Sequence, residues 1–252
     1  MSGTPLVPAR FHGYIQTMHR GAGAEPRVSF TAETDMAPLV ERWLETIGSV
    51  CIGREVEVGF GIPDLVAGVG DRAALRNRRR QAQPVTQSLQ LALLDFCRVS
   101  RSESDLREWA PSGFSELKRQ ALQPLMKREL VLVRNGKFRA RVAPRDPFDT
   151  LVAVELKLAD ATRGLAQAHA YRVFADISYL ALPARRVSSS VMDRARSIGV
   201  GILAVHPGLV EEVVCPDPAS FATAGRRRMA SEYTLAAHAD GASRLAGAPK
   251  RR

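Results

Sequence analysis

The sequence has few cysteines and no long hydrophobic run. Its three cysteines, Cys51, Cys97 and Cys215, are too few and too far apart to form a zinc site or a disulfide framework. No apolar run approaches the roughly 18 residues that a membrane-spanning helix needs. The first residues have neither the charged nor the apolar region of a signal peptide. These absences predict a cytoplasmic protein with reduced thiols and no membrane segment.

Positive charge is concentrated in one part of the chain. The 252 residues are enough for one domain or two, and the whole chain carries a net charge of +10. Residues 72–145 contain 17 basic and six acidic side chains, a net charge of +11. A basic segment inside a nearly neutral chain is typical of a module that binds a polyanion. The alternative is a solvated surface without a partner.

On both sides of the basic segment, helical and strand-like patterns alternate. Apolar residues at helical spacing predict a helix over 36–47. The other expected elements are strands at 54–60, 62–67, 151–158, 178–182 and 199–205, and helices at 162–177 and 188–197. This alternation indicates an α/β domain.

The basic segment has a different pattern. It begins with a polar, arginine-rich stretch at 71–83, interpreted as a linker. Helices are then expected at 84–97, 102–109 and 114–128, followed by a tight hairpin that turns at Asn135-Gly136. Three helices followed by a hairpin are the element order of a winged helix-turn-helix domain.

The two ends of the chain show little pattern. Residues 1–33 contain several prolines and glycines and are predicted to form an irregular arm. Residues 216–252 are rich in alanine, arginine and glycine and are predicted to be largely disordered. The sequence therefore predicts one domain formed by 34–70 and 146–215, interrupted by a basic insert at 71–145.

Three polar residues lie within the apolar strands of this domain. Asp64 follows a proline in one strand, and Glu155 and Lys157 leave the same face of another because side chains alternate along a strand. Such charges cost free energy unless something compensates them, and a bound cation would. Two carboxylates suit Mg²⁺, which stabilises charge on a phosphate, and a lysine can orient the attacking water.

These residues resemble the PD-(D/E)xK nuclease superfamily. Pro63-Asp64 matches its first half-motif, Glu155-Leu156-Lys157 matches its second, and Gln167 and Tyr171 match a helix that commonly follows. The resemblance implies a restriction-endonuclease-like fold, with a mixed central sheet flanked by helices. It also implies that Asp64 and Glu155 bind the metal, that Lys157 positions the water, and that Gln167 supports the site.

A third acidic metal ligand is implied on the first helix, where Glu41 and Glu45 are both candidates and Glu41 is taken as the ligand. The chain departs from the family in one respect. Asp64 and Glu155 are 91 residues apart, whereas a short hairpin usually separates the half-motifs. The basic insert accounts for the excess, because the entropy cost of closing a loop grows slowly with its length.

The insert is predicted to bind duplex DNA through its third helix and its hairpin. The expected contacts are Ser115, Lys118 and Arg119 in the major groove, and Arg134, Lys137 and Arg139 on phosphates. Together with the resemblance, this predicts a Mg²⁺-dependent DNA endonuclease in which Mn²⁺ can substitute. A homodimer would allow both strands to be cut. The alternatives are a non-catalytic DNA-binding regulator that uses the nuclease fold as a scaffold, and action on RNA.

Overall fold

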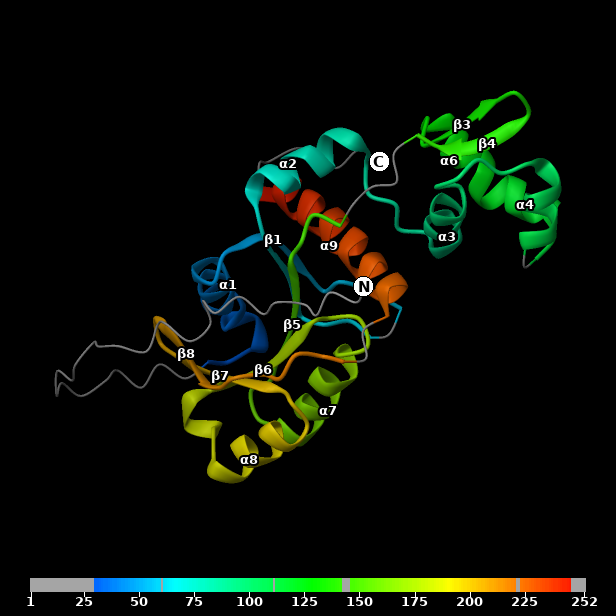
Figure 1. The fold of residues 1–252 in the computed structure, drawn as a ribbon. Coiled ribbons are helices and arrows are strands. Elements are labelled where there is room, and N and C mark those ends of the chain that lie inside the picture. Colours follow the sequence, from blue (N-terminus) through cyan, green and yellow to red (C-terminus); the bar gives the residue numbers. More distant parts are fainter. Residues whose placement is uncertain (1–29, 60, 111, 142–145, 221–222, 246–252) are drawn as a thin grey trace.

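The computed structural model describes residues 30–59, 61–110, 112–141, 146–220 and 223–245. Its centre is a six-stranded sheet in the order β1-β2-β5-β6-β7-β8 (Figure 1). The strands are β1 (Ser49–Arg54), β2 (Leu65–Val69), β5 (Thr150–Leu156), β6 (Ile177–Pro183), β7 (Gly201–His206) and β8 (Leu209–Val214). The pairs β5–β6 and β6–β7 are parallel, and the other three pairs are antiparallel. The sheet is therefore mixed, as predicted.

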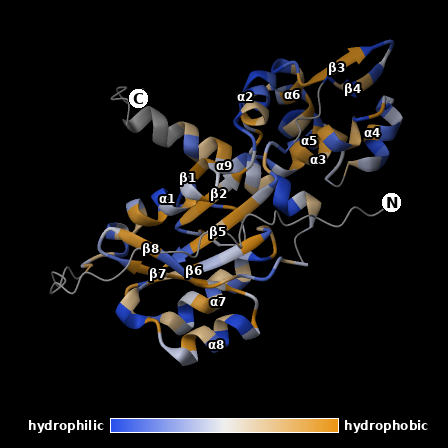
Figure 2. Cartoon of the chain, turned by 60° about the vertical axis from the view of Figure 1, so that its left-hand side comes forward, coloured by the Kyte–Doolittle hydropathy of each residue, from blue (hydrophilic) through white to orange (hydrophobic). Residues whose placement is uncertain are grey.

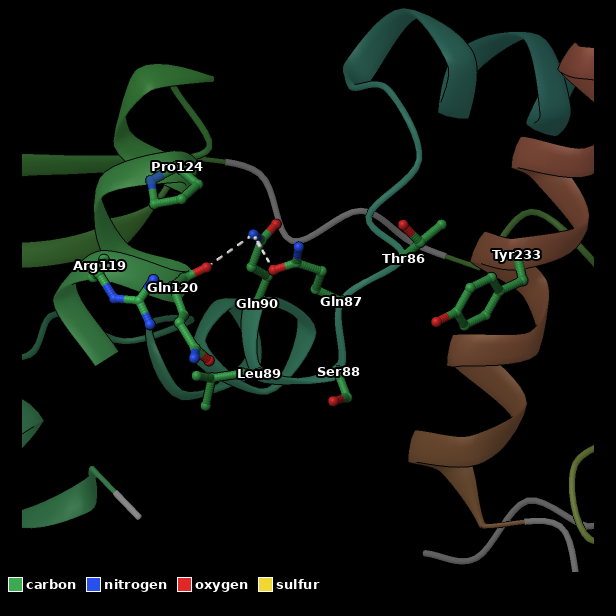
Figure 3. A pocket seen from close by; sticks show the side chains of 9 residues that line it. All are labelled: Thr86, Gln87, Ser88, Leu89, Gln90, Arg119, Gln120, Pro124 and Tyr233. Atoms are coloured by element: carbon green, nitrogen blue, oxygen red, sulfur yellow. Dashed lines mark hydrogen bonds between the residues drawn. The ribbon is translucent and has the colours of Figure 1, made fainter. Parts of the chain in front are cut away.

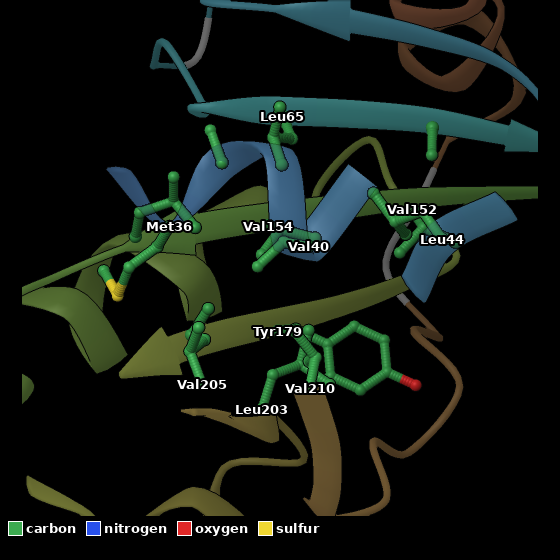
Figure 4. Close-up of a cluster of buried hydrophobic side chains, with 14 of the residues drawn as sticks. Met36, Val40, Leu44, Leu65, Val152, Val154, Tyr179, Leu203, Val205 and Val210 are labelled. Carbon is green, nitrogen blue, oxygen red and sulfur yellow. The ribbon is translucent and has the colours of Figure 1, made fainter. Parts of the chain in front are cut away.

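Helices cover both faces of this sheet. Helix α1 (Ala37–Thr46) buries Val40 and Leu44 against side chains from five of the strands (Figure 4). The opposite face is covered by α7 (Ala161–Tyr171), α8 (Ser189–Ser197) and α9 (Ala224–Leu245). Each fully buried leucine or valine contributes about 1.5–3 kcal/mol relative to an exposed one. The α/β class, with a sheet flanked by helices, is thus confirmed.

The strand β5 has no charged side chain on the face that packs beneath α1. Val152, Val154 and Leu156 pack in the cluster beneath α1, whereas Leu151 and Ala153 pack on the opposite face. Glu155 therefore lies on the same face as α7, as strand alternation predicts. Among the described residues, no helix is both long and apolar enough to cross a membrane.

The insert has a hydrophobic core of its own, formed by three helices and a hairpin. The first two helices are α3 (Ser88–Phe96) and α4 (Glu103–Trp109). The third helix consists of three continuous segments: α5 (Phe114–Leu117), a π-helical turn (Lys118–Leu122) and α6 (Gln123–Lys127). The hairpin is formed by β3 (Val131–Arg134) and β4 (Lys137–Ala140). Asn135 and Gly136 have φ values of 50° and 69°, as a two-residue type I′ turn requires. These elements lie where the sequence predicts them.

The chain leaves the sheet for the insert and returns from it at the same end of two neighbouring strands. β2 ends at Val69, which pairs with Thr150 at the start of β5. The opposite ends of the same two strands bring Leu65 next to Val154. The chain therefore enters and leaves the insert at the end of the sheet away from Asp64 and Glu155.

The prediction of a linker at 71–83 is wrong, because Arg72–Gln81 form the helix α2. Asp71 caps this helix by accepting a hydrogen bond from the backbone N–H of Ala73 at 2.9 Å. One side of α2 is buried through Leu75 and Arg78. The sequence shows no apolar stripe here because a buried arginine takes the place of an apolar residue.

Two further expectations are corrected. The first strand is Ser49–Arg54, not 54–60, because Glu55 and Gly59 have φ values of 48° and 78° that interrupt an extended chain. The predicted disorder after residue 216 is wrong for Ala224–Leu245, which form α9 and pack on β1 and β2. Most of the predicted arm at 1–33 lies outside the described residues, which begin at Phe30.

Candidate functional site

Asp64 and Glu155 lie together at the end of two paired strands. Asp64 directly precedes β2, and Glu155 is the next-to-last residue of β5. The Asp64 carboxylate Oδ2 accepts the backbone N–H of Leu156 at 2.7 Å, which ties the two segments together. Two residues 91 positions apart in the sequence therefore lie close together at one end of the sheet.

Glu155 is a buried carboxylate with a partner for each oxygen. Its side chain is 3% exposed. Oε1 accepts a hydrogen bond from Lys157 Nζ at 2.6 Å, and Oε2 accepts one from the Tyr171 hydroxyl at 2.7 Å. Burying a carboxylate is costly, and these two charge-assisted contacts offset that cost. Tyr171 therefore has a clear structural role: it holds Glu155 from the last turn of α7.

Lys157 is held in place beside Glu155 by two hydrogen bonds. Besides Glu155, its ammonium donates to the backbone carbonyl of Leu156 at 3.2 Å. Burial lowers the pKa of Lys157, but the hydrogen bond and the negative charge of Glu155 more than offset this, so the net pKa is raised. Gly164 of α7 makes room for the lysine, since a Cβ there would lie 2.9 Å from Lys157 Cγ. Lys157 is therefore a fixed positive charge at neutral pH.

The Asp64 carboxyl group has a pKa of about 6, well above its ordinary value of 3.8. Burial is the main cause, and the negative charges of Glu155 and Glu33 add to it. The backbone N–H of Leu156 and the ammonium of Lys157 act in the opposite direction. A nearby cation would relieve the crowding of negative charge at Asp64.

Glu33 is an acidic residue near the site that the sequence did not indicate. It lies in a short 3₁₀ turn (Glu33–Asp35) just before α1, and its Oε2 is 3.7 Å from Lys157 Nζ. Its Oε1 accepts the backbone N–H of Leu158 at 3.4 Å. No motif marks this position, because it falls in the segment interpreted as an irregular arm.

The role of Glu41 as a third metal ligand stays a prediction, and in this structure Glu41 is paired with Arg54. Its two carboxylate oxygens each accept a hydrogen bond from Arg54 at 2.6 Å. Among the described residues, no hydrogen bond or ion pair joins Glu41 to Asp64, Glu155 or Lys157. The reason is the orientation of α1, which turns Val40 and Leu44 towards the sheet and leaves Glu41 beside the end of β1. The alternative, Glu45, is exposed on the same helix.

Gln167 lies one helical turn before Tyr171 on α7, which places both on one side of the helix. Its side-chain oxygen Oε1 is buried and has no hydrogen-bond partner among the described residues. Gln167 also acts on the Tyr171 hydroxyl, where it opposes the rise in pKa caused by burial and by Glu155. A buried acceptor without a donor costs free energy, and a bound water molecule would satisfy it.

The six residues predicted to contact DNA are all exposed on the insert. They are Ser115, Lys118 and Arg119 on the third helix and Arg134, Lys137 and Arg139 on the hairpin. Arg119 forms an ion pair with Glu116 one turn earlier. The structure therefore leaves these side chains accessible, and it separates them from the carboxylates by the length of the central strands.

A pocket of about 710 Å³ lies at the junction of the insert and α9 (Figure 3). It is lined by the start of α3, by Arg119, Gln120 and Pro124 of the third helix, and by Tyr233 of α9. Gln90 joins α3 to the third helix by donating to Gln87 Oε1 at 2.8 Å and to the Gln120 carbonyl at 3.1 Å. No carboxylate lines this pocket. We therefore place the candidate chemistry at Asp64 and Glu155 instead.

We expect the raised pKa of Asp64 to appear in the pH dependence of stability. The folded state binds this proton more tightly than the unfolded chain, so the free energy of unfolding falls as pH rises from about 4 to about 6. Asp64→Asn removes the titration. Its stability relative to the wild type should therefore improve across this interval, as measured by urea unfolding at several pH values. Parallel pH profiles for the two proteins would contradict the assignment.

By its fold the chain is an α/β protein with a mixed six-stranded sheet and an inserted basic helical segment. No family model matches it, and no curated protein does. Among solved structures it is similar to a protein of unknown function from Silicibacter pomeroyi, with 19% sequence identity and a TM-score of 0.29. The match covers 39% of this chain and 62% of that protein. A likeness of this size carries no argument about function.

Proposed function

We propose that the protein is a Mg²⁺-dependent DNA nuclease that hydrolyses phosphodiester bonds, with a restriction-endonuclease-like core. The observation that carries the proposal is the meeting of Asp64 and Glu155 at the end of two paired strands, with Lys157 hydrogen-bonded to Glu155. This set of groups resembles the half-motifs of the PD-(D/E)xK nucleases in residue type and in order along the chain.

The donor set is consistent with a Mg²⁺ ion. Mg²⁺ prefers oxygen ligands and is usually held by one or two carboxylates together with water. Among the described residues, no group of three or more histidine, cysteine or acidic side chains could hold a metal ion. Asp64 and Glu155 would therefore share the ion with water, and the unpartnered Gln167 oxygen could accept a hydrogen bond from such a water.

When bound, Mg²⁺ would stabilise negative charge on the phosphate and activate the attacking water. Asp64 and Glu155 would hold the ion, and Tyr171 would keep Glu155 in place through its hydroxyl. Lys157 would release Glu155, orient the attacking water and stabilise the charge that develops on the phosphate. Lys157 thus acts through its position and its charge, without forming a covalent bond.

The insert supplies the second part of the proposal. Its three helices and hairpin follow the order of a winged helix, a fold that places its third helix in the major groove of duplex DNA. The exposed Lys118 and Arg119 on this helix suit the groove, and the exposed basic side chains of the hairpin suit phosphates. We therefore infer that the insert holds the DNA that the core cuts.

A second candidate is a DNA-binding regulator that does not cut. The observation that favours it is the state of Glu155, because both of its oxygens already have partners in Lys157 and Tyr171. A metal ion at Glu155 would have to use the second lone pair of one of these oxygens or displace one of the two hydrogen bonds. A regulator would keep both hydrogen bonds and use the core only as a scaffold.

Metal binding and cutting distinguish the two candidates. Supercoiled, linear and single-stranded DNA would be incubated with the protein in Mg²⁺, Mn²⁺ or EDTA, and the melting temperature would be measured at rising Mg²⁺. The nuclease predicts metal-dependent cutting and a rise in stability of about 2.7 kcal/mol at 100 times the dissociation constant. Asp64→Ala should lose both effects. Salt-sensitive DNA binding with no cutting in either metal would favour the regulator.

A further inference from the structure

The helix α2 presents a row of arginines to solvent. Arg72, Arg76 and Arg80 are spaced four residues apart, so they lie on one side of the helix, and all three are exposed. We call this row the α2 basic face. The described residues offer it no ion pair, and α2 itself contains no acidic residue. Figure 2 shows α2 as a strongly hydrophilic helix at the same end of the molecule as the insert.

The opposite side of α2 is fixed by a buried ion pair. Arg78 Nη2 donates to both carboxylate oxygens of Glu232 on α9, at 2.6 and 2.5 Å, and both side chains are 2% exposed. Leu75 packs beside this pair in the same core as α9. Because α2 is anchored in this way, the basic face has one orientation and cannot turn inwards.

The segment that follows the C-terminal end of α2 is hydrogen-bonded to the insert. The guanidinium of Arg128, at the end of the third helix, donates to the backbone carbonyls of Gln83 at 2.8 Å and Pro84 at 3.1 Å. These carbonyls lie just after α2. The α2 basic face and the DNA-binding helix proposed for the insert are therefore held in a defined relation, and one ligand could contact both.

We propose that the α2 basic face binds the phosphate backbone of duplex DNA, as a contact separate from the predicted helix and hairpin of the insert. The proposal rests on the proposed function, because it takes DNA as the ligand. Three arginines on one side of a helix repel one another, and an anion relieves that repulsion. From Arg72 to Arg80 the helix rises about 12 Å, which matches about three to four steps along one DNA strand.

The test measures DNA affinity as a function of salt. A fluorescent duplex of about 20 base pairs would be titrated with full-length protein between about 50 and 300 mM salt. Arg76→Gln/Arg80→Gln should weaken binding about ten-fold or more and reduce the slope of log K against log salt by about two. The matched control, Arg42→Gln/Arg194→Gln, removes the same charge from exposed positions on α1 and α8 and should change the slope little.

The outcomes distinguish failure of the α2 basic face from failure of the proposed function. If the wild type does not bind duplex DNA, the proposed function fails and this inference fails with it. If the wild type binds and both double variants keep its slope and affinity, only the α2 basic face is excluded. An equal loss in the two double variants would show a general charge effect and would also exclude it. Tighter binding of an RNA duplex of the same length would show that RNA, and not DNA, is the ligand of this face.

Discussion

Lys157→Met is expected to slow DNA cutting by about 10²- to 10³-fold while leaving DNA binding intact. Removing one group that stabilises developing charge has an effect of this size on catalytic rates. The methionine keeps most of the length of the side chain and loses only the ammonium that contacts Glu155 at 2.6 Å. The measurement is the rate of cutting at saturating protein, together with duplex affinity. A folded Lys157→Met protein that cuts at the wild-type rate would exclude the proposed role.

This variant needs a control for folding, because it leaves the buried Glu155 without its positive partner. Breaking a buried ion pair in this way costs about 3–5 kcal/mol. Lys157→Met/Glu155→Gln removes both charges, so it should recover much of the lost stability without recovering the cutting rate. A control in the insert, Lys118→Met, should weaken DNA binding and leave the cutting rate at saturation unchanged. The two variants together separate loss of chemistry from loss of fold and from loss of binding.

Glu232→Ala is expected to be the most destabilising single change in α9. It leaves the Arg78 guanidinium buried without a counter-charge and removes the acceptor of the Val85 backbone N–H, which lies 2.7 Å from the carboxylate. The expected cost is about 3–5 kcal/mol, a large part of the roughly 5–15 kcal/mol that stabilises a typical protein. Urea unfolding monitored by circular dichroism measures it.

The double variant Arg78→Met/Glu232→Leu provides the comparison. Replacing both charges with apolar side chains removes the uncompensated charge, so much of the stability should return. A loss as large as that of Glu232→Ala would mean that packing, and not the unpaired charge, sets the cost. A loss below about 1 kcal/mol in Glu232→Ala itself would show that water reaches Arg78 when the glutamate is removed.

Local signals predicted the central strands and the hairpin well. The Asn135-Gly136 turn follows from backbone preference, and β5 follows from its β-branched apolar run. The segment 71–83 failed because its helix depends on Arg78 and Glu232, which are 154 positions apart. A pattern inside a short window cannot reveal a partner so far along the chain. The helix α9 was not predicted for the same reason, because it packs on β1 and β2, which are far away in the sequence.

In the candidate site, too, local patterns identify some residues, whereas others depend on packing between distant segments. Asp64, Glu155 and Lys157 were found because charges inside apolar strands are unusual and strand alternation fixes their faces. The third acidic group could not be found in this way. Helix α1 offers two glutamates with reasonable spacing, yet Arg54 pairs with Glu41, and the acidic residue near Lys157 is Glu33. Which glutamate approaches the site depends on how α1 packs, and the sequence does not encode that locally.

The insert departs from the sheet at Val69 and Thr150, whereas Asp64 and Glu155 lie at the other end of the same strands. With a rise of about 3.3 Å per residue, the five residues of β2 alone span about 13 Å. Base pairs in B-DNA are about 3.4 Å apart, so this length corresponds to about four base pairs. A duplex held by the insert and cut at the carboxylates would be cut to one side of the bases that the insert reads.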